Sequence, residues 1–241
     1  MYRALIEVTH PGRAALSEEE AHHLVKVRRA KKGDLFIGLD GQGSLYRCSL
    51  DRDRLGWYGN IEEEMAAPGE SPVSIILGQA LIKKDKFEWV IQKATELGVR
   101  EIVPLITFRT ELQLEPAREE RQMIRWNKIL VEAVKQSGRT RLPLLRSPLP
   151  LEKFLTGTLP KFAMFLDEHG KSPLKTVLEG RTGETSCLVL VGPEGGWAEQ
   201  DRALIESKGI SRVHLGSRIL RTETAGLTVL SILQYELAGL E

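Results

Sequence analysis

The chain has 241 residues, of which 41% are hydrophobic and 28% are charged, and its formal net charge at pH 7 is +1. This composition is typical of a globular protein with a sizeable core, and no apolar run approaches the roughly 20 residues that span a bilayer. Glu7 and His10 interrupt the N-terminal apolar stretch, so we expect neither a signal peptide nor a membrane partner. The two cysteines, Cys48 and Cys187, fit neither a disulfide framework nor a zinc ligand set, which favours a cytoplasmic location.

Residues 1–70 predict a small β-rich domain. Ser17 is followed three residues later by Glu20, a capping box that predicts a short helix through Val27. Strands are expected at 4–8, 35–39, 45–50 and 56–61, with a glycine-containing hairpin connection at 40–43. A stretch with proline and glycine at 65–72 then indicates a linker.

Residues 73–241 show a different pattern, in which apolar strands alternate with helices. The apolar residues from Phe87 to Leu97 share one face of a helix that Gly98 ends, and a long helix is expected over 116–137. The expected strands are 73–81, 102–106, 162–166, 187–191 and 212–215. This alternation predicts an α/β domain with a mainly parallel sheet.

The sharpest cluster of charge lies early in the chain. Five of the seven residues from Lys26 to Lys32 are basic, which is compatible with a nucleic-acid contact even though the net charge is small. Cations at the end of a helix also complement the helix dipole. The run alone therefore leaves two interpretations open, an RNA contact and a solvated helix end.

A glycine-rich stretch, Gly192-Pro193-Glu194-Gly195-Gly196-Trp197, follows a predicted buried strand and precedes a helix that begins near Ala198. Glycines at such a position let the backbone approach a ligand and leave amides to hydrogen-bond it. The stretch matches neither the G-x-G-x-x-G motif nor the P-loop, so an ordinary glycine turn also remains open.

A second motif begins at another strand end and runs into the C-terminal helix. Leu215, Ile219 and Leu220 would form an apolar slot for a planar base, whose polar edge the amides near Gly216 would contact. Arg221 and Glu223 follow, although an i, i+2 pair does not share a helix face. The core face of that helix is expected at Ala225, Val229, Ile232 and Leu233.

The end of the long helix carries a polar stripe. Glu132, Gln136 and Arg139 are spaced i, i+4 and i+7, so they lie on one face. Such a stripe is usually the solvated side of a helix, but a carboxylate, an amide and a guanidinium together also suit an anionic or planar substrate.

Taken together, these pieces resemble the bacterial 16S rRNA (uracil-N3)-methyltransferases of the SPOUT superfamily. The resemblance covers nearly the whole chain, including 21–27 with Gly33-Asp34, 92–99, 132–139, 192–196 and 215–225. Two positions depart from the family pattern: Arg28 stands where leucine is expected, and Ala198 where a small hydroxyl residue often caps the helix. Alanine caps a helix less firmly than serine or threonine.

The resemblance implies a fold that strand and helix patterns do not show. It implies a trefoil-knotted SPOUT methyltransferase domain with a parallel sheet over 73–241, preceded by a small PUA-like RNA-binding β-barrel domain over 1–70. It further implies a homodimer that binds S-adenosylmethionine and acts on 16S rRNA, within the assembled small ribosomal subunit. The cofactor contacts are expected at Leu166, Glu168, Gly192, Gly196, Leu215, Gly216, Ile219 and Leu220, and the RNA contacts at Lys26, Arg29, Lys31 and Lys32.

The implied reaction assigns candidate roles to four further residues. N3 of uracil carries a proton at neutral pH and must lose it to become a nucleophile, so groups that stabilise the uracilate oxygens assist the reaction. Arg221 and Arg139 are candidates for that task or for holding phosphate. Glu194 and Glu223 are candidates for a base or for orienting the arginines, and orientation is favoured because a glutamate with an unshifted pKa near 4.3 is a weak base.

Two other functions fit the sequence less well. A nicotinamide-dependent enzyme would need the G-x-G-x-x-G loop and an acidic ribose ligand, which the chain lacks. A non-catalytic rRNA-binding or assembly factor would leave the stretch from Ile219 to Arg221 unexplained. His22 and His23 have no spaced partners for a metal; Trp126 is expected in the core or an interface, and a base-stacking role for Trp197 stays open.

Overall fold

A computed structural model of the chain describes residues 1–67, 69–110, 116–181 and 183–238. Two compact units are present: Met1–Glu70 with Val131–Leu142, and Ser71–Leu130 with Pro143–Glu241. The expected linear division into 1–70 and 73–241 leaves out the return of residues 131–142 to the first unit. There the amide of Leu142 donates to the carbonyl of Gly41 at 2.9 Å.

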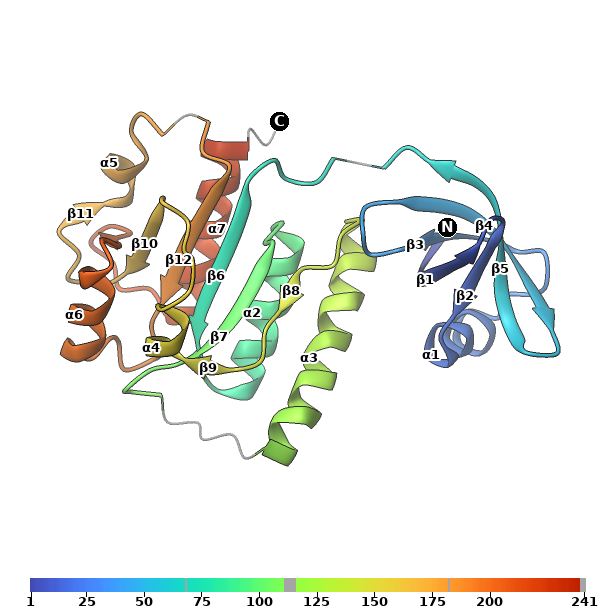
Figure 1. The fold of residues 1–241 in the computed structure, drawn as a ribbon, viewed down its shortest axis with the longest axis horizontal. Helices are drawn as coiled ribbons and strands as arrows, with labels where there is room; N and C mark the ends of the chain where they lie inside the picture. The colour runs from blue at the N-terminus through green and yellow to red at the C-terminus, as the bar shows by residue number, and fades with distance from the viewer. Residues whose placement is uncertain (68, 111–115, 182, 239–241) are drawn as a thin grey trace. The chain divides into compact units, whose positions relative to one another are not determined.

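The first unit contains a closed barrel (Figure 1). Around the barrel the strands are β1 (Tyr2–His10), β2 (Arg13–Leu16), β5 (Gly56–Met65), β4 (Leu45–Asp53) and β3 (Leu35–Leu39). Only β1 and β3 pair in parallel among these strands. Two glycines let the barrel close tightly, because a Cβ at Gly38 would lie 2.5 Å from Ile6 Cδ1 and one at Gly59 would lie 2.8 Å from Phe36 Cζ.

The predicted N-terminal helix is confirmed as α1 (Glu18–His22), which continues as a π-helical turn, η1 (His23–Val27). Ser17 Oγ accepts a hydrogen bond from the Glu20 amide at 3.2 Å, as the capping box requires. Glu20 Oε1 also accepts a hydrogen bond from Lys135 Nζ at 2.8 Å, and both side chains are 9% exposed. This buried pair joins the end of the long helix to α1 within the first unit.

The second unit is built on an eight-stranded sheet with the order β11-β13-β10-β12-β6-β7-β8, in which β9 also pairs with β7. Every pairing in it is parallel among the described residues. The strands are β6 (Ser74–Ala80), β7 (Glu101–Ile106), β8 (Leu144–Leu145), β9 (Leu149–Pro150), β10 (Ala163–Leu166), β11 (Ser172–Pro173), β12 (Ser186–Val191) and β13 (Ser211–His214). The predicted α/β class with a parallel sheet is confirmed.

The helices of this unit pack beside the sheet (Figure 1). They are α2 (Lys84–Glu96), α4 (Leu151–Phe154), α5 (Leu174–Leu178), α6 (Glu199–Ser207), α7 (Thr222–Ala238) and the part of α3 (Pro116–Ser137) that precedes residue 131. The expected core face of α7 is partly wrong. Val229 and Leu233 are buried, but Ala225 and Ile232 are only half-buried, and Gly226, Leu227 and Leu230 take their place.

The burial of Trp126 and of the two cysteines bears on the predictions made for them. Trp126 is 2% exposed and packs on Phe87 with ring centroids 4.6 Å apart, so it belongs to the core as expected. Both cysteines are free and buried, and burial raises the pKa of Cys48 to about 11 and that of Cys187 to about 12. None of the helices in the described residues is long and apolar enough to cross a membrane.

Candidate active site

A cavity of about 770 Å³ lies where β10, β12 and β13 end. In a parallel sheet the carboxyl ends of the strands meet at one edge, which is where α/β proteins bind ligands. The cavity is lined by all eight residues expected to hold the cofactor and by three of the four catalytic candidates: Leu166, Glu168, Gly192, Glu194, Gly196, Leu215, Gly216, Ile219, Leu220, Arg221 and Glu223. The structure therefore brings together motifs that lie up to 57 positions apart in the chain, from Leu166 to Glu223.

Glycines shape two of the three loops around the cavity. Gly196 has φ +69° and Gly216 has φ +114°, a backbone conformation that side chains with a Cβ rarely adopt. Gly192 is needed for a different reason, because a Cβ there would lie 3.0 Å from the Trp197 ring. The ordinary-turn interpretation of residues 192–196 is thus incomplete, since this turn also forms a cavity wall.

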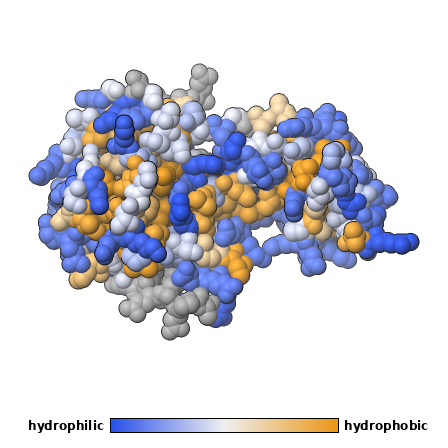
Figure 2. All heavy atoms as spheres, viewed as in Figure 1, coloured by the Kyte–Doolittle hydropathy of each residue, from blue (hydrophilic) through white to orange (hydrophobic). Residues whose placement is uncertain are grey.

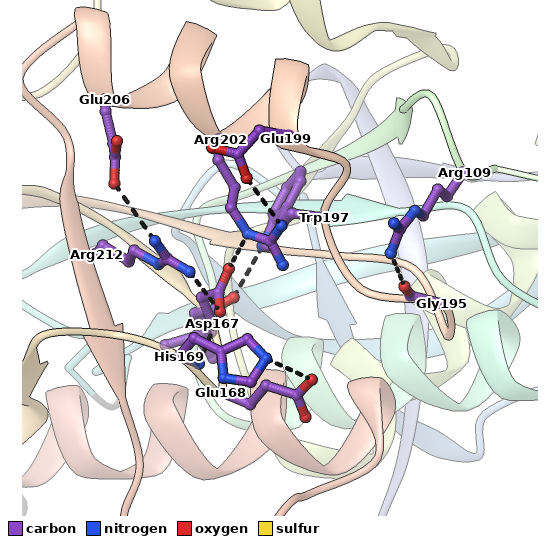
Figure 3. Close-up of polar contacts among 11 residues, drawn as sticks. Arg109, Asp167, Glu168, His169, Gly195, Trp197, Glu199, Arg202, Glu206 and Arg212 are labelled. Atoms are coloured by element: carbon purple, nitrogen blue, oxygen red, sulfur yellow. Dashed lines mark hydrogen bonds and ion pairs between the residues drawn. The ribbon is translucent and has the colours of Figure 1, made fainter.

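Trp197 connects two of the loops. Its side chain is buried at 1% exposure, and its Nε1 donates to the carbonyl of Leu166 at 2.8 Å (Figure 3). The ring also meets Phe165 edge-on at 6.1 Å between centroids. Because the indole is enclosed, it offers no open face to a base, and its contribution is to hold the loop after β10 against the loop after β12.

A second connection, which the sequence did not indicate, centres on Asp167. Its carboxylate accepts hydrogen bonds from Arg202 Nε at 2.7 Å, Arg212 Nη2 at 3.2 Å and the His169 amide at 2.8 Å (Figure 3). Burial alone would raise the pKa of Asp167, but these donors together lower it below its ordinary value. Asp167 thus joins the loop after β10 to α6 and β13. The only hint of its importance in the sequence is its position directly after a buried strand.

Charged groups also meet on the inner side of the cavity. Lys86 of α2 forms ion pairs with Glu194 and, at 3.6 Å, with Glu223 Oε1. Its hydrogen bond to Glu194 raises the pKa of Lys86 and keeps the ammonium charged. Glu223 is 8% exposed, and its Oε2 is buried without a hydrogen-bond partner among the described residues. A buried carboxylate oxygen in this state is a strong acceptor for a ligand.

The start of α7 is fixed to the neighbouring strands. Thr222 Oγ1 donates to the carbonyl of Gly192 and accepts from Gln79 Nε2 at 3.1 Å. These bonds hold Glu223 beside the cavity. Ala198, at the start of α6, provides no side-chain cap, as expected from its departure from the family pattern.

Arg139 does not line this cavity. It belongs to the first unit, where its Nη2 pairs with Glu70 Oε2 at 2.8 Å and its side chain is 9% exposed. Burial alone would raise the pKa of Glu70, but Arg139 and the amides of Arg141 and Thr140 together lower it. Glu132 and Gln136 of the same stripe are exposed.

The four expected RNA contacts also lie in the first unit, in and just after η1. All four are exposed: Lys26, Arg29, Lys31 and Lys32. Lys32 is paired with Asp51 at 2.7 Å, and this hydrogen bond raises its pKa. Within the described residues no three metal-binding side chains gather, at His22 and His23 or elsewhere.

Two family models match this chain. An RNA methyltransferase domain matches residues 69–234, and an RNA methyltransferase PUA domain matches residues 16–55. The two matches fall on the parallel-sheet part and on the barrel, respectively.

Several curated relatives are similar over most of their length. The ribosomal RNA small subunit methyltransferase E of Bacillus subtilis is 32% identical, over 92% of this chain and 90% of the relative. The protein of the same name from Synechocystis is 34% identical, over 94% of this chain and 73% of the relative.

Solved structures agree in fold. The ribosomal RNA small subunit methyltransferase E of Neisseria gonorrhoeae, bound to S-adenosyl methionine, superposes with a TM-score of 0.89 at 28% identity and covers all of both chains. A Legionella pneumophila methyltransferase in complex with the same cofactor gives 0.90 at 30% identity, over 98% of this chain and 97% of the other. The predicted fold class, a SPOUT methyltransferase domain with a parallel sheet that a small β-rich PUA-like domain precedes in the chain, is confirmed. The chain belongs to the RNA methyltransferase family, in the group of ribosomal RNA small subunit methyltransferases E.

Proposed function

We propose that this protein transfers the methyl group of S-adenosylmethionine to N3 of a uridine in the 16S rRNA of the small ribosomal subunit. The observation that supports this most directly is the cavity at the strand ends, in which three loops and the buried carboxylate of Glu223 converge. The names of the relatives support the RNA substrate, and the cofactor in the neighbouring structures supports the methyl donor.

The residues of the cavity fit S-adenosylmethionine. A volume of about 770 Å³ lies within the range of sites for ligands of this size. Leu166, Leu215 and Leu220 offer apolar surface for the adenine, while the backbone around Gly196 and Gly216 can approach the ligand closely. The donor carries a sulfonium and an ammonium, which suit a cavity that contains the carboxylates of Glu168, Glu194 and Glu223. When bound, this cofactor supplies an electrophilic methyl group.

The protein must then manage the charge of the uracil. N3 forms a bond to the methyl carbon as the carbon–sulfur bond breaks, and the N3 proton has to leave. Glu223 Oε2 is the available acceptor for that proton or for its hydrogen bond, because it is buried with no partner in the described structure. Arg221 is exposed at the mouth of the cavity, where its guanidinium stabilises the uracilate oxygens. Glu194 is already paired with Lys86, so its role in this proposal is to orient that lysine.

The barrel supplies the RNA affinity. Lys26, Arg29 and Lys31 project from the end of η1 and would contact phosphates. Lys32 contributes less, because its ammonium already pairs with Asp51 at 2.7 Å. The substrate in this proposal is the assembled small subunit, and a cytoplasmic location follows from that substrate.

The proposed active form is a homodimer. The second unit exposes large hydrophobic side chains on α2, α3 and β8, namely Trp89, Ile124 and Leu144, and Figure 2 shows hydrophobic residues gathered over this part of the molecule. Exposed apolar patches of this kind mark interfaces. Of the polar stripe, Gln136 is exposed and available to a second subunit. Glu132 is exposed but already pairs with Lys135 at 2.5 Å, and Arg139 would first have to leave Glu70. Sedimentation at micromolar concentration should show a species of about twice 27.0 kDa, and a 27.0 kDa species alone would contradict the dimer.

The proposed activity is tested with small ribosomal subunits from a strain that lacks this modification. The protein and labelled S-adenosylmethionine are added, the rRNA is digested, and mass spectrometry should find 3-methyluridine. Naked 16S rRNA in a parallel reaction tests the requirement for the assembled subunit, and calorimetry with NAD tests the nicotinamide alternative. Absence of 3-methyluridine with a protein that binds the cofactor would refute the proposal.

A further inference from the structure

A second cavity, of about 360 Å³, lies at the same edge of the sheet. It is formed by residues that follow β6 and β7 and by the turn of Pro193 to Gly195 after β12. The first cavity is lined by the same turn, so the two share a wall. Since β12, β6 and β7 are neighbours in the sheet, the second cavity continues the row of sites at the carboxyl ends of the strands.

One side of the second cavity presents an aromatic ring. Phe108 is 68% exposed, which is unusual for so large an apolar side chain, and it sits on a tight turn directly after β7. Thr110 Oγ1 accepts from the Thr107 amide at 2.9 Å, and the Phe108 amide donates to Asp201 Oδ2 of α6 at 3.2 Å. The backbone that presents the ring is therefore held in place from two sides.

Two cationic side chains line the second cavity together with that ring. Lys83 lines both cavities, and Arg109 lines the second one. Arg109 Nη1 donates to the carbonyl of Gly195 at 2.7 Å, which holds the guanidinium against the shared wall (Figure 3). Leu81 and Ile82 are buried and supply an apolar floor. An exposed ring, an apolar floor and two cations are the groups that bind a base and its phosphate.

We propose that the second cavity binds the nucleotide adjacent to the methylated uridine, with its base stacked on Phe108 and its phosphate near Lys83 and Arg109. This inference rests on the proposed function, because it takes single-stranded RNA as the substrate. The occupant is a neighbour of the reacting base and not that base itself, because the turn of Pro193 to Gly195 stands between this cavity and the one that fits the cofactor.

The test compares two exposed aromatic residues of the same unit. Phe108→Ala should raise the KM for small ribosomal subunits on the order of tenfold, because a stacked base is lost, while the Kd for S-adenosylmethionine stays unchanged. Phe108→Trp should restore the KM, since any aromatic ring provides a stacking surface. Tyr235→Ala is the matched control, because Tyr235 is 67% exposed on α7 and lines neither cavity.

Crosslinking provides a readout that does not depend on turnover. RNA that carries a photoreactive base next to the target uridine should crosslink to the turn of residues 107–110 in the native protein. An unchanged KM in Phe108→Ala, or a KM that rises equally in Tyr235→Ala, would overturn the inference. Failure of the proposed function is distinguishable, because the native protein would then form no 3-methyluridine at all.

Discussion

Replacement of Asp167 by asparagine tests whether the loops around the cofactor cavity are held by one buried carboxylate. The substitution keeps the size of the side chain and one acceptor for the His169 amide, but it removes the charge that pairs with Arg202 and Arg212. Hydrogen bonds to charged groups are worth about 1.5–3 kcal/mol each. The two arginine side chains are 15% and 20% exposed, so water replaces part of the loss.

The expected net cost is therefore about 2–3 kcal/mol of unfolding free energy, which corresponds to a fall in Tm of roughly 4–12 °C for a chain of this length. Cofactor affinity should fall as well, on the order of tenfold, because Asp167 joins the loop after β10 to α6 and β13. Differential scanning calorimetry gives the first quantity and isothermal titration the second.

Glu199→Gln is the matched control for this experiment. Glu199 also contacts Arg202, at 3.5 Å, but its side chain is 91% exposed, and exposed pairs of this kind contribute little. If Asp167→Asn lowers neither Tm nor cofactor affinity by more than Glu199→Gln does, the carboxylate does not organise the site.

Three further results are expected. Gly216→Val should weaken S-adenosylmethionine binding at least tenfold, as measured by calorimetry, because φ +114° is strained for a β-branched residue. The change in Tm should be much smaller. Normal binding would show that this loop does not hold the cofactor. Arg221→Ala should lower kcat and leave the salt dependence of RNA binding unchanged. Neutralising Lys26 and Lys31 together should reduce the slope of log affinity against log salt concentration by about 1–2 and preserve kcat at saturating RNA. Equal effects from both variants would contradict the separation of docking from chemistry. Because the pKa of Asp167 is lowered on folding, its stabilising effect is complete above the unfolded pKa near 3.9 and is lost as the pH falls through the lower folded pKa. The difference in Tm between the native protein and Asp167→Asn should therefore shrink as the solution is acidified, and a difference that does not shrink would count against this role.

Much of the fold was predictable because buried parallel strands appear in the sequence as continuous apolar runs. The predicted strands at 102–106 and 187–191 agree with β7 and β12 to within one residue. The core face of α7 was less predictable. The helix is apolar on most sides, so periodicity alone did not show that Gly226 and Leu230 face inward.

The site was predictable where a single motif supplies it. Residues 192–196 and 215–223 line one cavity, and this placement follows from the position of each motif directly after a strand. The contacts of Asp167 could not be predicted from the sequence. Arg202 and Arg212 lie 35 and 45 positions away, and spacing along the chain does not show which distant residues come into contact. The pairing of Arg139 with Glu70, 69 positions apart, was missed for the same reason.

The wall that the two cavities share has a thermodynamic consequence. A ligand in either cavity contacts the same turn, Pro193 to Gly195, so a ligand that shifts or restricts this turn changes the affinity on the other side. If the second cavity binds RNA as proposed, coupling through this turn is reciprocal: the factor by which RNA changes the affinity for the methyl donor equals the factor by which the donor changes the affinity for RNA.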